Sequence, residues 1–185
     1  MITRFGFSPR KPGLSRREFE VHWQDVHGPL IPHMPGLRGY RQNRRPDSYM
    51  VGDTNYDALA ETDFESFAEM EASFQSSYYR ETVMPDEGRF VQRDQGFAIL
   101  TKAPSNKPRG SGLCRMLLLR KEQDEGLLGR LEAELGTNSI YYVLNEQISE
   151  QARDVLAIAI DNNDDETSLI IGASGVIIAD CVVVA

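Results

Sequence analysis

The feature that most constrains the fold is the order of strand-like and helix-like segments, because the same order occurs twice along the 185 residues. In the first half, a strand pattern is followed by a helix, two strands, a second helical region and a last strand. This is the order of a split βαβ, or ferredoxin-like, unit. The expected strands are 2–8, 36–43, 56–62 and 96–101, and the expected helices are 16–27, 63–74 and a broken helix over 76–90.

Residues 113–185 repeat this order in a reduced form, although no residues match between the halves beyond the pattern. The expected strands are 113–121, 139–148, 155–161 and 175–185, and the expected helices are 124–135 and 164–173. Between the halves lies KAPSNKPRGSG, which is rich in Pro, Gly and Ser and has no apolar periodicity. We therefore predict a first unit at 1–102, a linker at 103–112 and a second unit at 113–185.

An antiparallel sheet with helices on one face leaves its other face bare, and that face must be covered. The simplest cover for each predicted sheet is the sheet of the other half. We therefore predict an α+β fold in which tandem ferredoxin-like units close an α/β barrel within one chain, with antiparallel sheets and helices outside. In that arrangement a homodimer would be an addition to the in-chain pairing.

Composition narrows the classes of partner. The net charge of −8 and the isoelectric point of about 4.9 argue against nucleic acid or an anionic membrane as the main partner. No apolar run approaches the roughly 20 residues that span a bilayer, and MITRFGFSPRK lacks the features of a signal peptide, so we expect a cytoplasmic protein. Cys114 and Cys181 lie in apolar strand-like runs, which favours buried free thiols.

The stretch EFEVHWQDVHGPL places two histidines around the only tryptophan of the chain. Ser15 and Glu18 form a capping-box pattern, so a helix should begin near Arg16. Gly28 suits a left-handed C-cap and Pro29 cannot continue the hydrogen-bond ladder, so the helix should end at His27.

On an ideal helical wheel, one apolar stripe runs along this helix. It consists of Phe19, Trp23, Val26 and Leu30. His22 and His27 then flank the stripe on opposite edges, about 140° apart at about 100° per residue. Helical metal ligands lie three or four residues apart, so we expect no metal site here.

Several of these side chains have a functional and a structural interpretation. His27 could act as a general acid or base, since histidine titrates nearest neutral pH, or it could be a cationic partner of the helix C-terminus. His22 and Trp23 fit ordinary packing. Tyr40 and Gln42 share one face of a strand, where they could line a small-molecule pocket or meet solvent.

A basic cluster follows the same strand. It consists of Arg38, Arg41, Arg44 and Arg45. Such a run could hold a carboxylate, or it could form a solvated face.

Residues 10–43 carry a set of short motifs that resembles the EthD family. The motifs are an opening K-x-G-L-S, a helix, an H-x-P-L turn and a P-G-L-R-x-Y strand. YDALAETDFESFAEM and DEGRFV, at 56–70 and 86–91, are similar to later parts of the same family. The resemblance covers residues 2–101, whereas 103–185 carry no such signature.

This resemblance implies a dimeric α/β-barrel fold with a pocket between sheet and helices. It also implies action on small cyclic metabolites, as in lactone isomerases or dehydratases of aromatic polyketides, without metal or organic cofactor. His27 corresponds to the histidine of the H-x-P-L turn. We therefore expect a cofactor-independent enzyme that transfers a proton on a small aromatic or lactone-like metabolite. His27 would be catalytic, and His22, Trp23, Tyr40 and Gln42 would bind the substrate.

Two alternatives stay open from the sequence. The first is a non-catalytic binding or accessory protein of a degradation pathway, with the same pocket but no chemistry. The second is a monooxygenase of the wider α/β-barrel superfamily, either cofactorless or haem-dependent, in which His27 would be an axial ligand of the haem.

Overall fold

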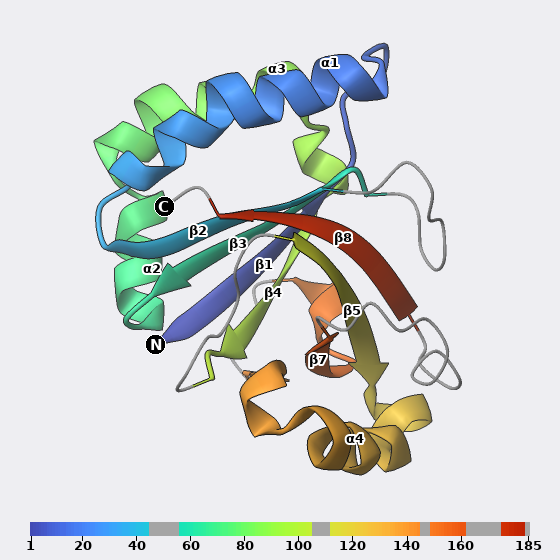
Figure 1. Cartoon of the computed structure of the whole chain (residues 1–185). Coiled ribbons are helices and arrows are strands. Elements are labelled where there is room, and N and C mark those ends of the chain that lie inside the picture. Colours follow the sequence, from blue (N-terminus) through green and yellow to red (C-terminus); the bar gives the residue numbers. More distant parts are fainter. Residues whose placement is uncertain (45–55, 105–111, 145–148, 162–174, 184–185) are drawn as a thin grey trace.

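The computed structural model describes residues 1–44, 56–104, 112–144, 149–161 and 175–183. In these residues, strands from both halves close into one barrel in the order β1-β3-β2-β8-β5-β7-β6-β4, and all neighbours pair antiparallel (Figure 1). The strands are β1 Ile2–Ser8, β2 Leu37–Arg44, β3 Ala58–Phe64, β4 Phe97–Lys102, β5 Gly112–Arg120, β6 Ile140–Val143, β7 Val155–Asp161 and β8 Gly175–Val183.

The two halves use the same strand order. The first forms β4-β1-β3-β2 and the second β8-β5-β7-β6, which is the ferredoxin-like order in both. The halves meet at two seams, β2 with β8 and β4 with β6. The predicted fold and the in-chain barrel are therefore confirmed. The unit boundaries and the linker at 103–112 stay a prediction, since 105–111 lie outside the described residues.

The barrel interior holds an apolar core to which both halves contribute. Phe5 of β1 meets Tyr141 of β6 edge to face, with ring centroids 5.2 Å apart. Strands of both halves supply the buried members of this core, which include Phe5, Phe7, Leu59, Ile99, Met116, Leu118, Tyr141, Ile158 and Ile160. Each sheet thus covers the inner face of the other, as predicted from the sequence.

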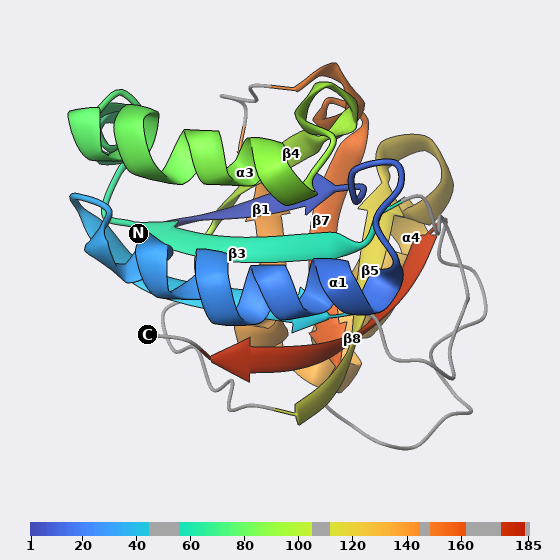
Figure 2. The same cartoon turned by 90° about the horizontal axis from the view of Figure 1, so that it is seen from above.

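The helices lie outside the barrel. They are α1 Arg16–Val21, which continues as the π-helical segment His22–His27 and the 3-10 segment Gly28–His33; α2 Phe67–Phe74; the π-helical segment Tyr79–Val83, which continues as α3 Met84–Phe90; and α4 Lys121–Leu135. Single 3-10 turns occupy Arg93–Gln95, Thr137–Ser139 and Glu150–Ala152. Seen from above, α1 and α3 lie side by side across the first sheet (Figure 2). None of the helices in the described part of the chain has the length and apolar character needed to cross a membrane.

The predicted start of the first helix is confirmed, but its predicted end is wrong. The Ser15 and Glu18 capping box is present, and Gly28 is not a left-handed cap, since its φ is −51°. The helical path continues through Pro29 to His33. Pro29 lies in the first turn of the 3-10 segment, a position that its fixed φ allows.

The second proline predicted to break a helix behaves in the same way. Pro85 lies in the first turn of α3, directly after the π-helical segment Tyr79–Val83, and the helical path is not broken there. Both prolines therefore follow a π-helical segment, and each stands at the first turn of the helical segment that follows it.

Three further expectations concern single elements. Val26 is 45% exposed, so its predicted place in the buried stripe is wrong, because the π-helical turn changes the phase of the side chains.

The predicted helix at 164–173 lies outside the described residues. The cysteines lie on neighbouring strands β5 and β8, but their side chains lie outside the description, so the expectation of buried thiols stays a prediction.

Candidate functional site

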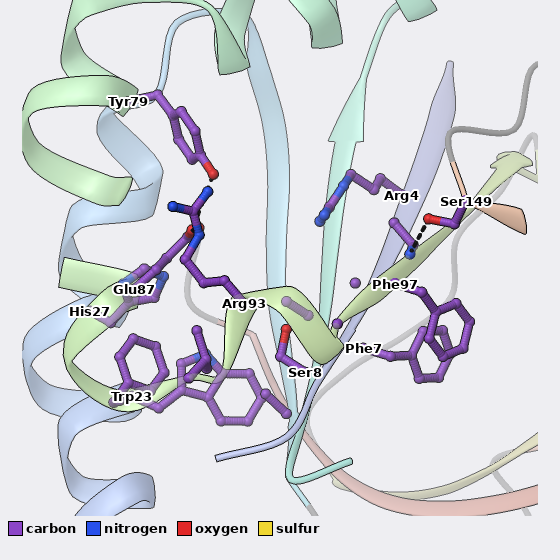
Figure 3. Close-up of a pocket in the computed structure, with 17 residues that line it drawn as sticks. Arg4, Phe7, Ser8, Trp23, His27, Tyr79, Glu87, Arg93, Phe97 and Ser149 are labelled. Atoms are coloured by element: carbon purple, nitrogen blue, oxygen red, sulfur yellow. Dashed lines mark hydrogen bonds and ion pairs between the residues drawn. The ribbon is translucent and has the colours of Figure 1, made fainter. Parts of the chain in front are cut away.

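A cavity of about 230 Å³ lies between the outer face of the first sheet and the helices that cover it (Figure 3). Its floor is made of small residues. Gly6 of β1 stands directly opposite Ala60 of β3 on one side and Ala98 of β4 on the other. Three neighbouring strands thus lack bulky side chains at one level, which leaves room between sheet and helices.

The walls of the cavity come from the helices, the ends of the strands and one residue of the second half. The lining residues are Arg4, Gly6, Phe7, Ser8, Trp23, His27, Ala58, Ala60, Tyr79, Glu87, Phe90, Val91, Arg93, Gly96, Phe97, Ala98 and Ser149. Ser149 accepts a hydrogen bond at its Oγ from the backbone N–H of Ala98, 3.0 Å away. The cavity combines aromatic surface with a few polar groups, as small-molecule sites do.

The π-helical turn brings both histidines to one carboxylate. His22 Nε2 lies 3.0 Å from Asp86 Oδ1, and His27 Nδ1 lies 3.0 Å from Asp86 Oδ2. The predicted separation of about 140° is therefore wrong. It assumed an α-helix, whereas a π-helix has more residues per turn, so residues five apart return to nearly the same face.

The partner of His27 fixes its chemistry. An ionised carboxylate only accepts hydrogen bonds, so Nδ1 of His27 carries the proton that it shares with Asp86. Nε2 then has no hydrogen-bond partner among the described residues. Burial lowers the pKa of His27, an effect that the hydrogen bond to Asp86 opposes. The side chain is 6% exposed, and its neutral form is a base with a free nitrogen at the cavity wall.

Gln42 and Tyr40 lie beneath Trp23 and are not among the lining residues. Gln42 Nε2 donates to the backbone carbonyl of Trp23 at 2.7 Å and to Tyr40 Oη at 3.1 Å. Gly28 makes this approach of helix to strand possible, because a Cβ there would stand 2.9 Å from Gln42 Nε2. Burial raises the pKa of Tyr40, although hydrogen bonds from Gln42 and Trp23 lower it, so the phenol is neutral near pH 7.

A second polar cluster lines the same cavity and was not expected from the sequence. Tyr79 Oη donates to Glu87 Oε2 at 3.1 Å, and Arg93 Nε lies 3.1 Å from the same oxygen. Burial raises the pKa of Glu87, against the opposing effect of Arg93, and burial together with Glu87 raises the pKa of Tyr79 to about 12. The acidic pair in DEGRFV is the sequence signal for this cluster.

The structure therefore divides the predicted site residues into two groups. His27 and Trp23 line the cavity together with Phe90, whose ring packs against both histidine rings. His22 reaches His27 only through Asp86, and Tyr40 and Gln42 support Trp23 from below. In the described residues no three His, Cys, Asp or Glu side chains are grouped so that they could hold a metal ion.

The basic cluster of the second strand is dispersed. Arg41 turns toward Glu61 and Asp63, at 3.9 and 3.7 Å, whereas exposed Arg38 pairs with Glu69 at 3.9 Å. Alternation along the strand sends these guanidinium groups to different faces. The cluster therefore does not form one carboxylate site among the described residues.

Comparisons with known proteins agree with this architecture. Residues 11–94 match the family model of the EthD domain, so the first half carries an EthD-family segment. An EthD-family protein from Bacillus halodurans covers 55% of this chain and 98% of its own length, with 16% identity and a TM-score of 0.44. No curated protein matches the sequence.

Solved structures that cover the whole barrel are also similar to this chain. A protein described as anthrone oxidase-like covers 100% of this chain and 93% of its own, at 9% identity and a TM-score of 0.56. A protein from Fusobacterium nucleatum, provisionally assigned as a monooxygenase, covers 100% and 92%, at 7% identity and a TM-score of 0.55. These likenesses confirm the dimeric-type α/β-barrel fold.

Proposed function

We propose that this protein is a cofactor-independent enzyme that transfers a proton on a small aromatic or lactone-like metabolite, as an isomerase or dehydratase does. The observation that supports this most is the pair formed by Asp86 and His27 at the wall of the cavity. A neutral imidazole that is oriented by a carboxylate is a suitable base for a carbon acidified by a neighbouring carbonyl.

The proposed reaction uses the two ring nitrogens of His27 differently. Nε2 takes a proton from the substrate carbon, while the Nδ1–H bond to Asp86 stabilises the imidazolium that forms. The same nitrogen then returns the proton to another carbon, which completes an isomerisation, or to a leaving hydroxyl group, which completes a dehydration. One positioned histidine contributes roughly 10²- to 10⁴-fold in rate, which is enough for an activated substrate.

The predicted substrate-binding residues take distinct roles in this proposal. Trp23 contacts the substrate directly, because its side chain lines the cavity. His22 is a positioning residue that fixes the Asp86 carboxylate, and Tyr40 and Gln42 hold the backbone and ring of Trp23 in place. At about 230 Å³ the cavity is below the roughly 300–1,000 Å³ of drug-sized sites, so it suits a ligand of one or two rings.

A cofactorless monooxygenase is the second candidate, favoured by the descriptions of two of the structures that share the whole barrel. Its first step would be the same proton abstraction, followed by reaction of the carbanion with O₂. The small cavity supports the cofactorless form over a haem enzyme. Substrate-dependent oxygen consumption would separate this candidate from an isomerase or dehydratase.

The test begins with a thermal-denaturation screen against lactones, anthrones and other small aromatic metabolites. A ligand at 100 times its Kd adds about 2.7 kcal/mol, which raises the melting temperature by several degrees. Each stabilising compound is then assayed for turnover with wild type and with His27→Gln. We expect the variant to lose about 10²- to 10⁴-fold in kcat while ligand binding persists.

His33→Gln is the matched control, because His33 is exposed and lies outside the cavity lining. It should turn over like the wild type. Ligands that bind the wild type without any turnover would contradict the proposal and would favour the non-catalytic binding protein.

A further inference from the structure

One cation at the cavity has no ion-pair partner in the described part of the chain. Arg4 of β1 lines the cavity, yet its guanidinium makes no hydrogen bond or ion pair with any residue that the structure describes. Its guanidinium packs over the ring of Phe74, whose centroid lies 5.0 Å from Cζ. A half-buried guanidinium with no anion in hydrogen-bond contact costs free energy, which an anionic ligand would offset.

The strand is built so that this group can reach the cavity. A Cβ placed on Gly6 would stand 2.5 Å from Arg4 Nη1, so the side chain lies over the bare backbone of Gly6. Figure 3 shows the guanidinium end of Arg4 turned toward the helices that carry Tyr79 and His27. The absence of a side chain on Gly6 therefore leaves room for the Arg4 side chain, and Gly6 also forms part of the cavity floor.

The nearby acid does not neutralise Arg4. Glu87 already accepts a hydrogen bond from Tyr79 Oη and pairs with Arg93 Nε, each at 3.1 Å and each at Oε2. The charge of Glu87 acts on Arg4 through space, but burial dominates and lowers the pKa of Arg4. The Arg4 guanidinium, which carries five N–H donors, lines the cavity, where a planar carboxylate would accept two of them.

We infer that Arg4 binds an anionic oxygen of the ligand, so that the substrates of this cavity are aromatic or lactone-like carboxylates. This inference rests on the proposed function for its site, and it specifies the substrate class. The base on the helix wall and the cation on the sheet floor would hold the substrate from opposite sides, with its reacting carbon toward His27 and its carboxylate toward Arg4.

The probes for the test are benzoate and 2-hydroxybenzoate, with benzamide as the neutral match of benzoate. Affinities are measured by isothermal titration for wild type, Arg4→Met and Gly6→Ala. We expect both carboxylates to bind the wild type more tightly than benzamide does. Loss of a bidentate charged contact should weaken carboxylate binding about 10- to 100-fold in Arg4→Met and leave benzamide unchanged.

Gly6→Ala keeps the charge and displaces the guanidinium, so it should weaken carboxylate binding as well. Arg38→Met is the control, because Arg38 is exposed and lies outside the cavity lining. It should bind like the wild type. Without ligand, Arg4→Met should melt at the same temperature as wild type or above it, since it removes an unpaired cation.

Equal affinity for benzoate and benzamide, or carboxylate binding that survives Arg4→Met, would overturn the inference. A melting temperature lowered by several degrees in Arg4→Met, with no loss of carboxylate affinity, would assign Arg4 to structure and overturn it too. The proposed function fails separately. His27→Gln should keep benzoate binding. Carboxylate binding that depends on Arg4, without turnover of any ligand, would therefore support the anion site and contradict the proposed enzymatic function.

Discussion

Asp86 determines what both histidines of the site can do. Its two oxygens lie 3.0 Å from His22 and from His27, and Arg89 is 3.7 Å from the first of them. The sequence indicated His27 as a candidate base through its motif, but it gave no sign of this partner. Asp86 lies 59 residues away in the chain, and only the packing of α3 against the π-helical turn brings it near.

At this scale the first prediction concerns the pH profile of catalysis. Burial lowers the pKa of His27, so the neutral base should persist below its ordinary value near 6.5. In a plot of kcat/KM against pH, the acid limb should fall at a pH under 6.5. An acid limb above 6.5 would mean that Asp86 outweighs burial.

A second residue-scale prediction concerns stability. A histidine whose folded pKa is lowered contributes stability that is present above its unfolded pKa and lost as pH falls through the folded pKa. For His27, this loss of stability begins at about pH 6.5 and continues as the pH falls further. Chemical denaturation of wild type and His27→Gln should therefore show a larger decline in the wild type between pH 7 and 5. Equal declines in the two proteins would show that the pKa of His27 does not change on unfolding.

At the level of elements, the sequence pattern did not predict the π-helical segments. Capping at Ser15 and the alternation along β1 were readable, because they depend on residues close in the chain. The shift of Val26 to solvent and the convergence of His22 and His27 on Asp86 depend on the wider π-helical turn. Residues distant in the chain contact this segment, since Gln42 donates to the carbonyl of Trp23 and Asp86 pairs with both histidines.

Gly28 gives a prediction for this element. Alanine there should meet Gln42 Nε2, which two hydrogen bonds hold in place, so Gly28→Ala should reduce the free energy of unfolding by about 1–3 kcal/mol. Urea denaturation measures this. Gly129→Ala in α4 is the control, because its Cβ would meet nothing within 4 Å, and it should stabilise by up to about 1 kcal/mol. Equal effects of both substitutions would show that Gln42 yields without cost.

For the whole molecule, the bare inner face of each predicted sheet was enough to foresee the barrel. The pattern of the second half, LCRMLLLRK and VLAIAID above all, predicted strands where β5 and β7 lie. The pattern did not predict which residues pair at the two seams. Four residue pairs join β2 to β8, from Arg41 with Val183 to Arg44 with Asp180, and two join β4 to β6. Register is set by contacts between halves that share no motif.

The seams lead to a prediction about residues 1–102 expressed alone. This fragment lacks β8 and β6, so the edges of β2 and β4 and the apolar inner face of the sheet would be uncovered. It should self-associate, which sedimentation velocity would detect as species larger than a monomer. A well-behaved monomer at tens of micromolar would contradict the role given to the second half.

The closed order of strands also bears on how the barrel behaves at low abundance. A barrel assembled from two separate chains comes apart when its subunits become scarce, because its stability depends on subunit concentration. Here the two sheets are tethered in one chain, so each meets the other at a fixed effective concentration. The cavity above the first sheet therefore stays supported at any dilution, and a few copies per cell would keep it intact as well as many.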